Sequence, residues 1–357
     1  MAVLLPTDFL LLECALYNCG VSSHCHCSLP HKNVCHVGNH SPPNAAFTYT
    51  QMALEIVIIF AAVTGRTLVL PPDTPFYLLG KQENGKKKTK HHGFADFLDL
   101  NSASLRREVD MITMKEFLER EGTTDGAPLT NDKLFSIEGG SIGQKIWKSA
   151  EQCYYFEKSD RPCNMVYGLL RKNAFVPEVR AAHHCLVFDA ALQSTGTTLS
   201  DGDILAAMSV VERNATTQFC GERTPVFYRG KLAEAPWIHI RGGERDYRLL
   251  EHFYAFLYFP DVAVDHYYKR FVRDFLHYTP TIWCAAGRVL QALEGEARAA
   301  GGRDATAPFS SLHVRRGDFQ YKKVRISAED WYKNTRELFR PDEIIYVATG
   351  RFDLAVK

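Results

Sequence analysis

The stretch Met52–Val63 constrains the fold of this chain more than any other segment. Its sequence, MALEIVIIFAAV, is apolar on nearly every side of a helix, which is typical of a helix buried on several faces. Gly65 follows and can end the helix in a left-handed conformation. Thr67–Leu70 then reads as a short buried strand, which Pro71 and Pro72 stop. A buried helix, a tight turn and an apolar strand are the repeating unit of an α/β domain, so the sequence predicts that fold class.

Later segments repeat the same alternation. The apolar spacing predicts further helices at Met111–Glu121, Arg248–Phe259, Asp265–Tyr278, 282–299 and Ala328–Phe339. It predicts further strands at His184–Ala190, Phe309–Val314 and Glu343–Thr349. The glycine-rich stretch GGRDATA after residue 300 is the clearest domain boundary. We therefore expect an atypical Cys/His-rich segment at 1–43, a domain at 44–300 and a smaller domain at 301–357.

Charge excludes two classes of partner. The 357 residues carry a formal net charge of +1, so no global field favours nucleic acid or an anionic membrane. The dense basic run Gly85–His92 lacks aromatic residues for base stacking and reads as a solvated loop. No apolar stretch is long enough to span a bilayer, so no transmembrane segment is expected.

The ten cysteines fall into two groups. Five are spread through the body of the chain, as in a secretory-pathway enzyme with a few disulfides: Cys153, Cys163, Cys185, Cys220 and Cys284. The glycosylation sequon Asn214-Ala215-Thr216 also suits a luminal compartment. The opening apolar stretch contains Asp8 and Glu13 and has no basic residues before it, so the secretory signal is incomplete.

The other five cysteines crowd the N-terminus together with four histidines. They are Cys14, Cys19, Cys25, Cys27 and Cys35. Thiolates and imidazoles suit zinc, and a zinc module is one interpretation. However, Cys25 and Cys27 are closer than the usual paired spacing, so disulfides or free thiols are the alternatives.

The motif HVRRGDF, His313–Phe319, directly follows a predicted strand. In open α/β sheets, ligands bind outside the carboxyl ends of strands. A guanidinium is permanently charged and forked, so Arg315 could chelate phosphate oxygens, while Gly317 would let the backbone approach a ligand. The alternatives are an interdomain ion pair between Arg315 and Asp318, or an Arg-Gly-Asp adhesion tripeptide.

Several stretches in this order resemble the GDP-fucose protein O-fucosyltransferase family. They are MALEIVIIFAAVTGRTLVLPP, RLLEHFYAFLYFPD, KRFVRDFLHYTPTIWCAA, HVRRGDF and EIIYVAT. The resemblance implies two facing Rossmann-like domains of GT-B type, the second apparently truncated here. It implies inverting transfer of fucose from GDP-fucose to a serine or threonine hydroxyl of a small folded Cys-rich protein domain. It also implies no metal, no cofactor besides the donor substrate, and a place in the lumen of the endoplasmic reticulum or Golgi.

The resemblance also assigns roles to residues of the motif. Arg315 would hold the diphosphate and stabilise the GDP leaving group. The remaining donor-pocket residues would be His313, Arg316, Gly317, Asp318 and Phe319. As the glycosidic bond breaks, negative charge grows on the β-phosphate, and a preorganised cation there stabilises the transition state.

The chain departs from the family pattern before the first helix. Where members carry Gly-Gly-Phe-Asn-Asn-x-Arg, this chain has NAAFTYTQ, with Ala45 and Ala46 in place of the glycines. In one branch of the family a glutamate ahead of this segment is the catalytic base, and Asn44 stands there instead. An amide cannot take a proton at neutral pH, so the base is unknown and the sequence predicts an inactive chain. The alternative function is a catalytically dead family member that acts by binding.

Overall fold

The structure is a computed structural model. It describes residues 34–38, 47–75, 81–83, 86–88, 91–124, 127–129, 140–155, 161–170, 176–189, 200–241, 256–299, 309–314, 327–340 and 343–349. The chain divides into two compact units, one of residues 27–277 and the other of residues 1–26 and 278–357. The domain limits expected from the sequence, and the arrangement of two facing Rossmann-like domains, stay predictions.

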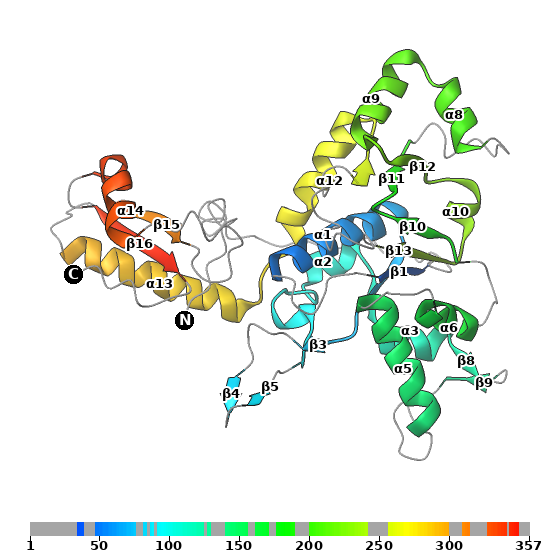
Figure 1. Ribbon diagram of the computed structural model, residues 1–357, viewed down its shortest axis with the longest axis horizontal. Coiled ribbons are helices and arrows are strands. Elements are labelled where there is room, and N and C mark those ends of the chain that lie inside the picture. The colour runs from blue at the N-terminus through cyan, green and yellow to red at the C-terminus, as the bar shows by residue number, and fades with distance from the viewer. Residues whose placement is uncertain are drawn as a thin grey trace. The chain divides into compact units, whose positions relative to one another are not determined.

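A five-stranded parallel sheet is the largest sheet among the described residues of the 27–277 unit (Figure 1). Its order is β10-β13-β1-β2-β7, and each neighbouring pair runs parallel. The strands are β10 (Glu178–Arg180), β13 (Trp237–Arg241), β1 (Val34–Gly38), β2 (Thr67–Leu70) and β7 (Met111–Thr113). Parallel strands joined through helices confirm the predicted α/β class.

The middle strand of this sheet, β1, comes from a segment without a strand pattern in the sequence. Val34 pairs with Trp237 of β13 on one side and with Thr67 of β2 on the other. The segment 1–43 therefore supplies the central strand of the sheet, although the sequence sets it apart from the α/β domain.

Helix α1 (Phe47–Thr64) matches the expectation of a helix buried on several faces. Consecutive residues Ile56, Val57 and Ile58 are all buried, and so is Phe60. Residues 56–60 are thus apolar and buried on successive sides of the helix, which means that the rest of the protein covers α1 on several sides. Gly65 ends the helix with φ +65°, which confirms the predicted left-handed cap.

Side-chain alternation along the strands separates the two faces of the sheet. Val69 and Trp237 pack in one apolar cluster with α3 (Met114–Glu121), α5 (Gly140–Tyr155) and α6 (Arg161–Leu169). The opposite face carries α1, which also contacts α12 (Val262–Phe275) (Figure 1). Since His239 and Arg241 share the parity of Trp237 along β13, they point to the α5–α6 face.

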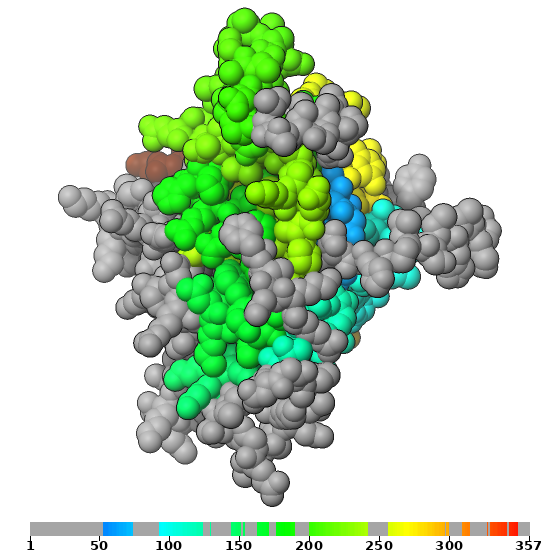
Figure 2. Space-filling view, turned by 90° about the vertical axis from the view of Figure 1, so that its right-hand side faces the viewer, coloured from blue at the N-terminus to red at the C-terminus, as the bar shows by residue number. Residues whose placement is uncertain are grey.

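A second parallel sheet, of order β12-β11-β14, follows on from β10. Its strands are β12 (Thr224–Phe227), β11 (His184–Val187) and β14 (Leu257–Tyr258). A disulfide between Cys185 and Cys220 ties β11 to α9 (Val210–Cys220). A second disulfide joins Cys153 of α5 to Cys163 of α6, so the expected bridges of the chain body are present. Helices α8 (Asp201–Ala207) and α9 stand at the top of both views (Figure 1, Figure 2).

A buried arginine connects α1 to a short helix that precedes β13. Arg66 donates from Nη1 to the carbonyl oxygen of Ala235 at 2.8 Å and from Nη2 to that of Ala233 at 2.7 Å. Its Nε donates to the Tyr228 hydroxyl at 2.9 Å. The carbonyls belong to the end of α10 (Gly230–Glu234), where a helix leaves carbonyl groups without intrahelical partners. Arg66 thus satisfies this helix end with a cation, which suits the negative end of the helix dipole.

Three predicted segments differ in the structure. The first part of Met111–Glu121 is strand β7, and the helix begins only after Thr113, which caps α3 through reciprocal hydrogen bonds with Glu116. The end of Arg248–Phe259 is β14, because Leu257 pairs with Leu186 of β11. The basic run 85–92, predicted to be a loop, contains β5 (Lys86–Lys88) and β6 (His91–His92).

In the second unit, helix α13 (Pro280–Ala299) precedes a parallel pair of strands. These are β15 (Phe309–Val314) and β16 (Ile344–Thr349), and α14 (Ala328–Thr335) lies between them in sequence. Both strands match their predicted bounds to within one residue. The described side chains of β15 are partly or largely exposed, in contrast to the buried strands of the other unit.

The remaining described elements are short. The antiparallel strand pairs are β3 (Thr74–Pro75) with β6, β4 (Lys81–Glu83) with β5, and β8 (Thr123–Thr124) with β9 (Ala127–Pro128). The further helices are η4 (Phe94–Asp96), α2 (Ala103–Glu108) and η6 (Arg336–Leu338). None of the helices in the described ranges has the length and apolar character needed to cross a membrane.

Candidate functional site

The carboxyl ends of β15 and β16 lie side by side at one edge of their sheet. Val314, the last residue of β15, pairs with Thr349, the last residue of β16. In sequence, Arg315 follows β15 directly and Gly350 follows β16. Because ligands of open α/β sheets bind outside the carboxyl ends of parallel strands, this edge is the first candidate for a binding site.

His313 is the sequence-predicted site residue that the structure describes. It lies one residue before the end of β15, pairs with Ala348 and is exposed. The other predicted residues lie outside the described residues: Arg315, Arg316, Gly317, Asp318 and Phe319. Their roles in binding the donor stay predictions.

A second carboxyl edge belongs to the five-stranded sheet. Gly38, the end of β1, pairs with Arg241, the end of β13, and Arg180 of β10 pairs with Arg241 from the other side. Helix α1 begins at Phe47, so residues 39–46 connect the carboxyl end of β1 to α1. Asn44 belongs to this connection, which itself lies outside the described residues. A strand-to-helix connection at a sheet's carboxyl edge is a common place for ligand contacts.

A polar cluster occupies the ends of β10 and β13. Arg241 donates from Nη1 to both carboxylate oxygens of Glu178, at 3.1 and 2.9 Å. Arg180 donates from Nη2 to Glu178 Oε2 at 3.2 Å, and the Tyr167 hydroxyl donates to Oε1 at 3.1 Å. Tyr167 also lies in hydrogen-bond contact with His239 Nδ1. The Glu178 carboxylate therefore receives donors from two strands and from α6.

The surroundings of Glu178 hold its carboxyl in the charged form. Burial by itself raises the pKa of Glu178, but the contacts with His239 and Arg241 outweigh burial, and its pKa lies well below the usual value of about 4.5. A carboxylate with a lowered pKa accepts a proton poorly at neutral pH. Glu178 is thus an anion that neutralises Arg241, and its lowered pKa makes it a poor general base.

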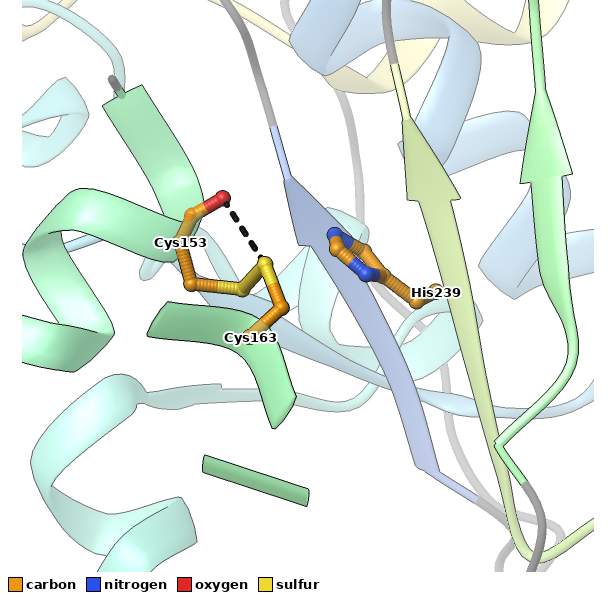
Figure 3. A group of neighbouring side chains, drawn as sticks. All are labelled: Cys153, Cys163 and His239. Atoms are coloured by element: carbon orange, nitrogen blue, oxygen red, sulfur yellow. Dashed lines mark hydrogen bonds between the residues drawn. A yellow bond between two sulfur atoms is a disulfide. The ribbon is translucent and has the colours of Figure 1, made fainter. Parts of the chain in front are cut away.

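The disulfide of α5 and α6 lies close to the buried His239 (Figure 3). Ligand atoms of Cys153, Cys163 and His239 lie within 4.8 Å of one another, a spacing that could hold a metal ion. However, a cysteine binds a metal as its thiolate, and here both sulfurs are joined in the disulfide. In the oxidised state the disulfide joins α5 to α6 beside His239 of β13, and it provides no thiolate to bind a metal.

The sequence analysis did not identify the Glu178 cluster. Its members lie on three elements, β10, β13 and α6, and Glu178 and Arg241 are 63 residues apart in sequence. One local signal exists in β13, WIHIR, where His239 and Arg241 alternate with isoleucines although every residue of the strand is buried. Two polar residues on one face of a buried strand require polar partners on the facing element.

Comparison with known proteins gives one family. The family model described as GDP-fucose protein O-fucosyltransferase matches residues 47–353. No significant match was found among curated proteins or among solved structures. The matched range begins at the first residue of α1 and includes β15, the motif 313–319 and β16.

Proposed function

Because the chain belongs to the GDP-fucose protein O-fucosyltransferase family, we propose that it binds GDP-fucose beside the carboxyl ends of β15 and β16. From there it transfers fucose to a serine or threonine hydroxyl of a protein acceptor. The observation that carries the proposal is the parallel register of the two strands, which brings Val314 and Thr349 together at the edge where Arg315 follows. That edge is where an α/β sheet offers backbone and loop groups to a ligand.

In this proposal Arg315 provides the main chemical assistance. The hydroxyl oxygen of the acceptor attacks the anomeric carbon of fucose from the side opposite to GDP, the configuration inverts, and the hydroxyl proton passes to solvent water, since no base is assigned. The bond between that carbon and the β-phosphate oxygen breaks, and its electron pair stays with GDP. A guanidinium at Arg315, next to this growing charge, would stabilise the transition state more than the ground state. His313, Arg316, Gly317, Asp318 and Phe319 shape the pocket, without a resident metal or cofactor.

Donor binding is tested by replacing the guanidinium with an ammonium group. Arg315→Lys should weaken GDP binding by about 2–3 kcal/mol, roughly 30- to 150-fold in Kd, because a point charge cannot replace a bidentate fork. Isothermal titration calorimetry with GDP measures this change. Arg340→Lys is the matched control, since Arg340 is exposed and precedes the amino end of β16. Equal GDP affinity for wild type and Arg315→Lys would rule out the assignment.

A second candidate function is binding of the donor without transfer, and Asn44 favours it. The connection between β1 and α1 has no carboxylate, because the sequence contains no Asp or Glu between Glu13 and Glu55. We expect fucosyl transfer by the natural chain to be slower by about 10²–10⁴-fold than with a general base in place.

Asn44→Glu tests which function applies. The variant should raise the rate of transfer to a panel of folded Cys-rich domains, followed by GDP release and by acceptor mass. His40→Glu adds a carboxylate to the same connection, keeps the sequon Asn39-His40-Ser41 and serves as the control. Transfer by the natural chain at the rate of Asn44→Glu would show that the chain is an active enzyme with another base.

The proposal includes the compartment. Two disulfides in the described residues and the family membership support a place in the lumen of the secretory pathway, in the endoplasmic reticulum or the Golgi. A small folded Cys-rich domain is the proposed acceptor because such domains fold in the same compartment.

A further inference from the structure

Helix α9 presents the sequon Asn214-Ala215-Thr216 in two opposite environments. Asn214 is exposed, whereas Thr216 is fully buried. Thr216 lies near Tyr258 of β14, and its buried hydroxyl has no hydrogen-bond partner among the described residues. One residue of the sequon therefore anchors the helix, and the other faces solvent.

The outward direction of Asn214 is fixed by covalent and aromatic contacts on the inner face of α9. Cys220 is bonded to Cys185 of β11. The ring of Phe219 packs on that of Tyr258, with their centroids 4.7 Å apart. The helix cannot rotate without breaking these contacts, so the outer face stays exposed.

The outer face of α9 is apolar next to Asn214. Val210 and Val211 are 62% and 79% exposed. They lie four and three residues before Asn214, so all three side chains share one face of the helix, one turn apart. Val210 and Val211 thus form a small exposed apolar surface directly beside Asn214.

We propose that Asn214 carries an N-linked oligosaccharide, and that its first sugars lie over Val210 and Val211. The donor is a lipid-diphosphate-linked oligosaccharide of the secretory pathway. The amide nitrogen of Asn214 gives up a proton to the transferase and bonds to the anomeric carbon of the first sugar. The bond from that carbon to the diphosphate breaks, and the lipid diphosphate leaves. The bulky hydrophilic product covers surface that the chain itself leaves open.

The burial of Thr216 also indicates when the oligosaccharide is added. In the folded protein Thr216 is inside the helix and buried, so a transferase cannot read the sequon. The oligosaccharide must therefore be added before α9 folds and before the Cys185–Cys220 disulfide closes. Natively folded protein without the oligosaccharide is not a substrate for the transferase.

Secreted expression of the full chain in a eukaryotic host, behind a cleavable signal sequence, tests the site. A second sequon, Asn39-His40-Ser41, is first removed by Asn39→Gln, so that one sequon remains. In this background the protein should lose mass on treatment with peptide N-glycosidase, which leaves aspartate at position 214 in the peptide map. Asn214→Gln and Thr216→Ala should abolish the shift.

Two variants control for folding. Thr216→Ser keeps the sequon, and Thr217→Ala removes the adjacent exposed hydroxyl without touching the sequon. Both should keep the mass shift in full. Absence of the shift in the Asn39→Gln protein, or its persistence in Asn214→Gln, would overturn the proposal.

The covering role is tested by association. Protein with Asn214→Gln should associate measurably faster than the glycosylated protein in light scattering at equal concentration. Adding Val210→Gln and Val211→Gln should restore the slow rate. If Asn214→Gln associates at the glycosylated rate, the sugars do not cover the valines.

Discussion

Two arginines, Arg66 and Arg241, are buried, and each places a positive charge inside the fold. Arg66 has backbone carbonyls and a hydroxyl among its acceptors, whereas Arg241 faces the carboxylate of Glu178. Arg66 therefore closes a helix end with its fork of donors. Arg241 depends on Glu178 remaining ionised, so its contribution to stability is linked to pH.

Glu178→Gln tests this linkage. The lowered pKa of Glu178 means that the charged carboxylate stabilises the fold above pH about 4.5, and that this stabilisation is lost as pH falls below that value. We expect wild type to exceed Glu178→Gln in free energy of unfolding at pH 7, and the difference to narrow steadily towards pH 3. Urea denaturation at several pH values measures it, with the exposed Glu222→Gln as the control. A difference that stays constant from pH 7 to pH 3 would contradict the role of the charge.

Single residues also limited what the sequence could predict about the site. Arg315 and Asp318 are predicted as site residues because a motif follows a strand, and a motif is local; their roles stay predictions. Glu178, His239 and Arg241 were missed because the cluster forms only when β10 and β13 become neighbours. A sequence pattern shows that a buried polar residue needs a partner, but it does not show which of many distant residues supplies it.

At the scale of elements, each disulfide joins a helix to a neighbour. Cys153 and Cys163 join α5 to α6 across 10 residues, while Cys185 and Cys220 join β11 to α9 across 35. A disulfide that closes a longer loop removes more entropy from the unfolded chain. The β11–α9 disulfide should thus contribute more to stability, although both pairs are buried.

Paired replacements by alanine test this order. Cys185→Ala with Cys220→Ala should lower the free energy of unfolding by about 3–4 kcal/mol, and Cys153→Ala with Cys163→Ala by about 2–3 kcal/mol. Chemical denaturation of the oxidised proteins compares the two variants, and the reduced wild type provides the reference. A larger loss for the α5–α6 pair would show that packing around the sulfurs, and not loop length, determines the effect.

Elements with a strong local pattern were predicted well. Strand β2 has its predicted bounds, and β15 and β16 agree to within a residue, because each is an apolar run bounded by turn residues. Leu257–Tyr258 was predicted as helix because its aromatic residues recur at helical spacing, but pairing with β11 makes it a strand. Strand β1 was missed because VCHVG has no alternation, and only its two partner strands define it.

At the scale of the whole molecule, the apolar core belongs to one unit. Every buried apolar residue among the described residues lies between Ala53 and Leu276. Both disulfides and the five-stranded sheet belong to the same unit, residues 27–277. The described residues of β15, α14 and β16 are partly or largely exposed, and a two-stranded sheet covers little apolar surface.

This distribution predicts that residues 27–277 fold on their own. The fragment should unfold in one cooperative transition and keep the pairings Cys153–Cys163 and Cys185–Cys220. Residues 278–357 alone should unfold gradually. Circular dichroism during heating and peptide mapping of the disulfides check both fragments. A gradual transition for residues 27–277 would show that the C-terminal unit is needed for their fold.

The central place of β1 has a consequence for how the protein is made. β1 meets β2 after about one helix of further chain, but its other neighbour begins only at Trp237. At a synthesis rate of about 5–20 residues per second, on the order of 10–40 s pass before β13 is available to pair with that edge of β1. During this time a strand in the middle of the finished sheet is an open edge, with backbone groups that another chain can pair with. The nascent chain therefore needs its open β1 edge kept from other chains until β13 has been synthesised. Mutations that slow the pairing of β13 with β1 should reduce the yield of folded protein without changing its free energy of unfolding.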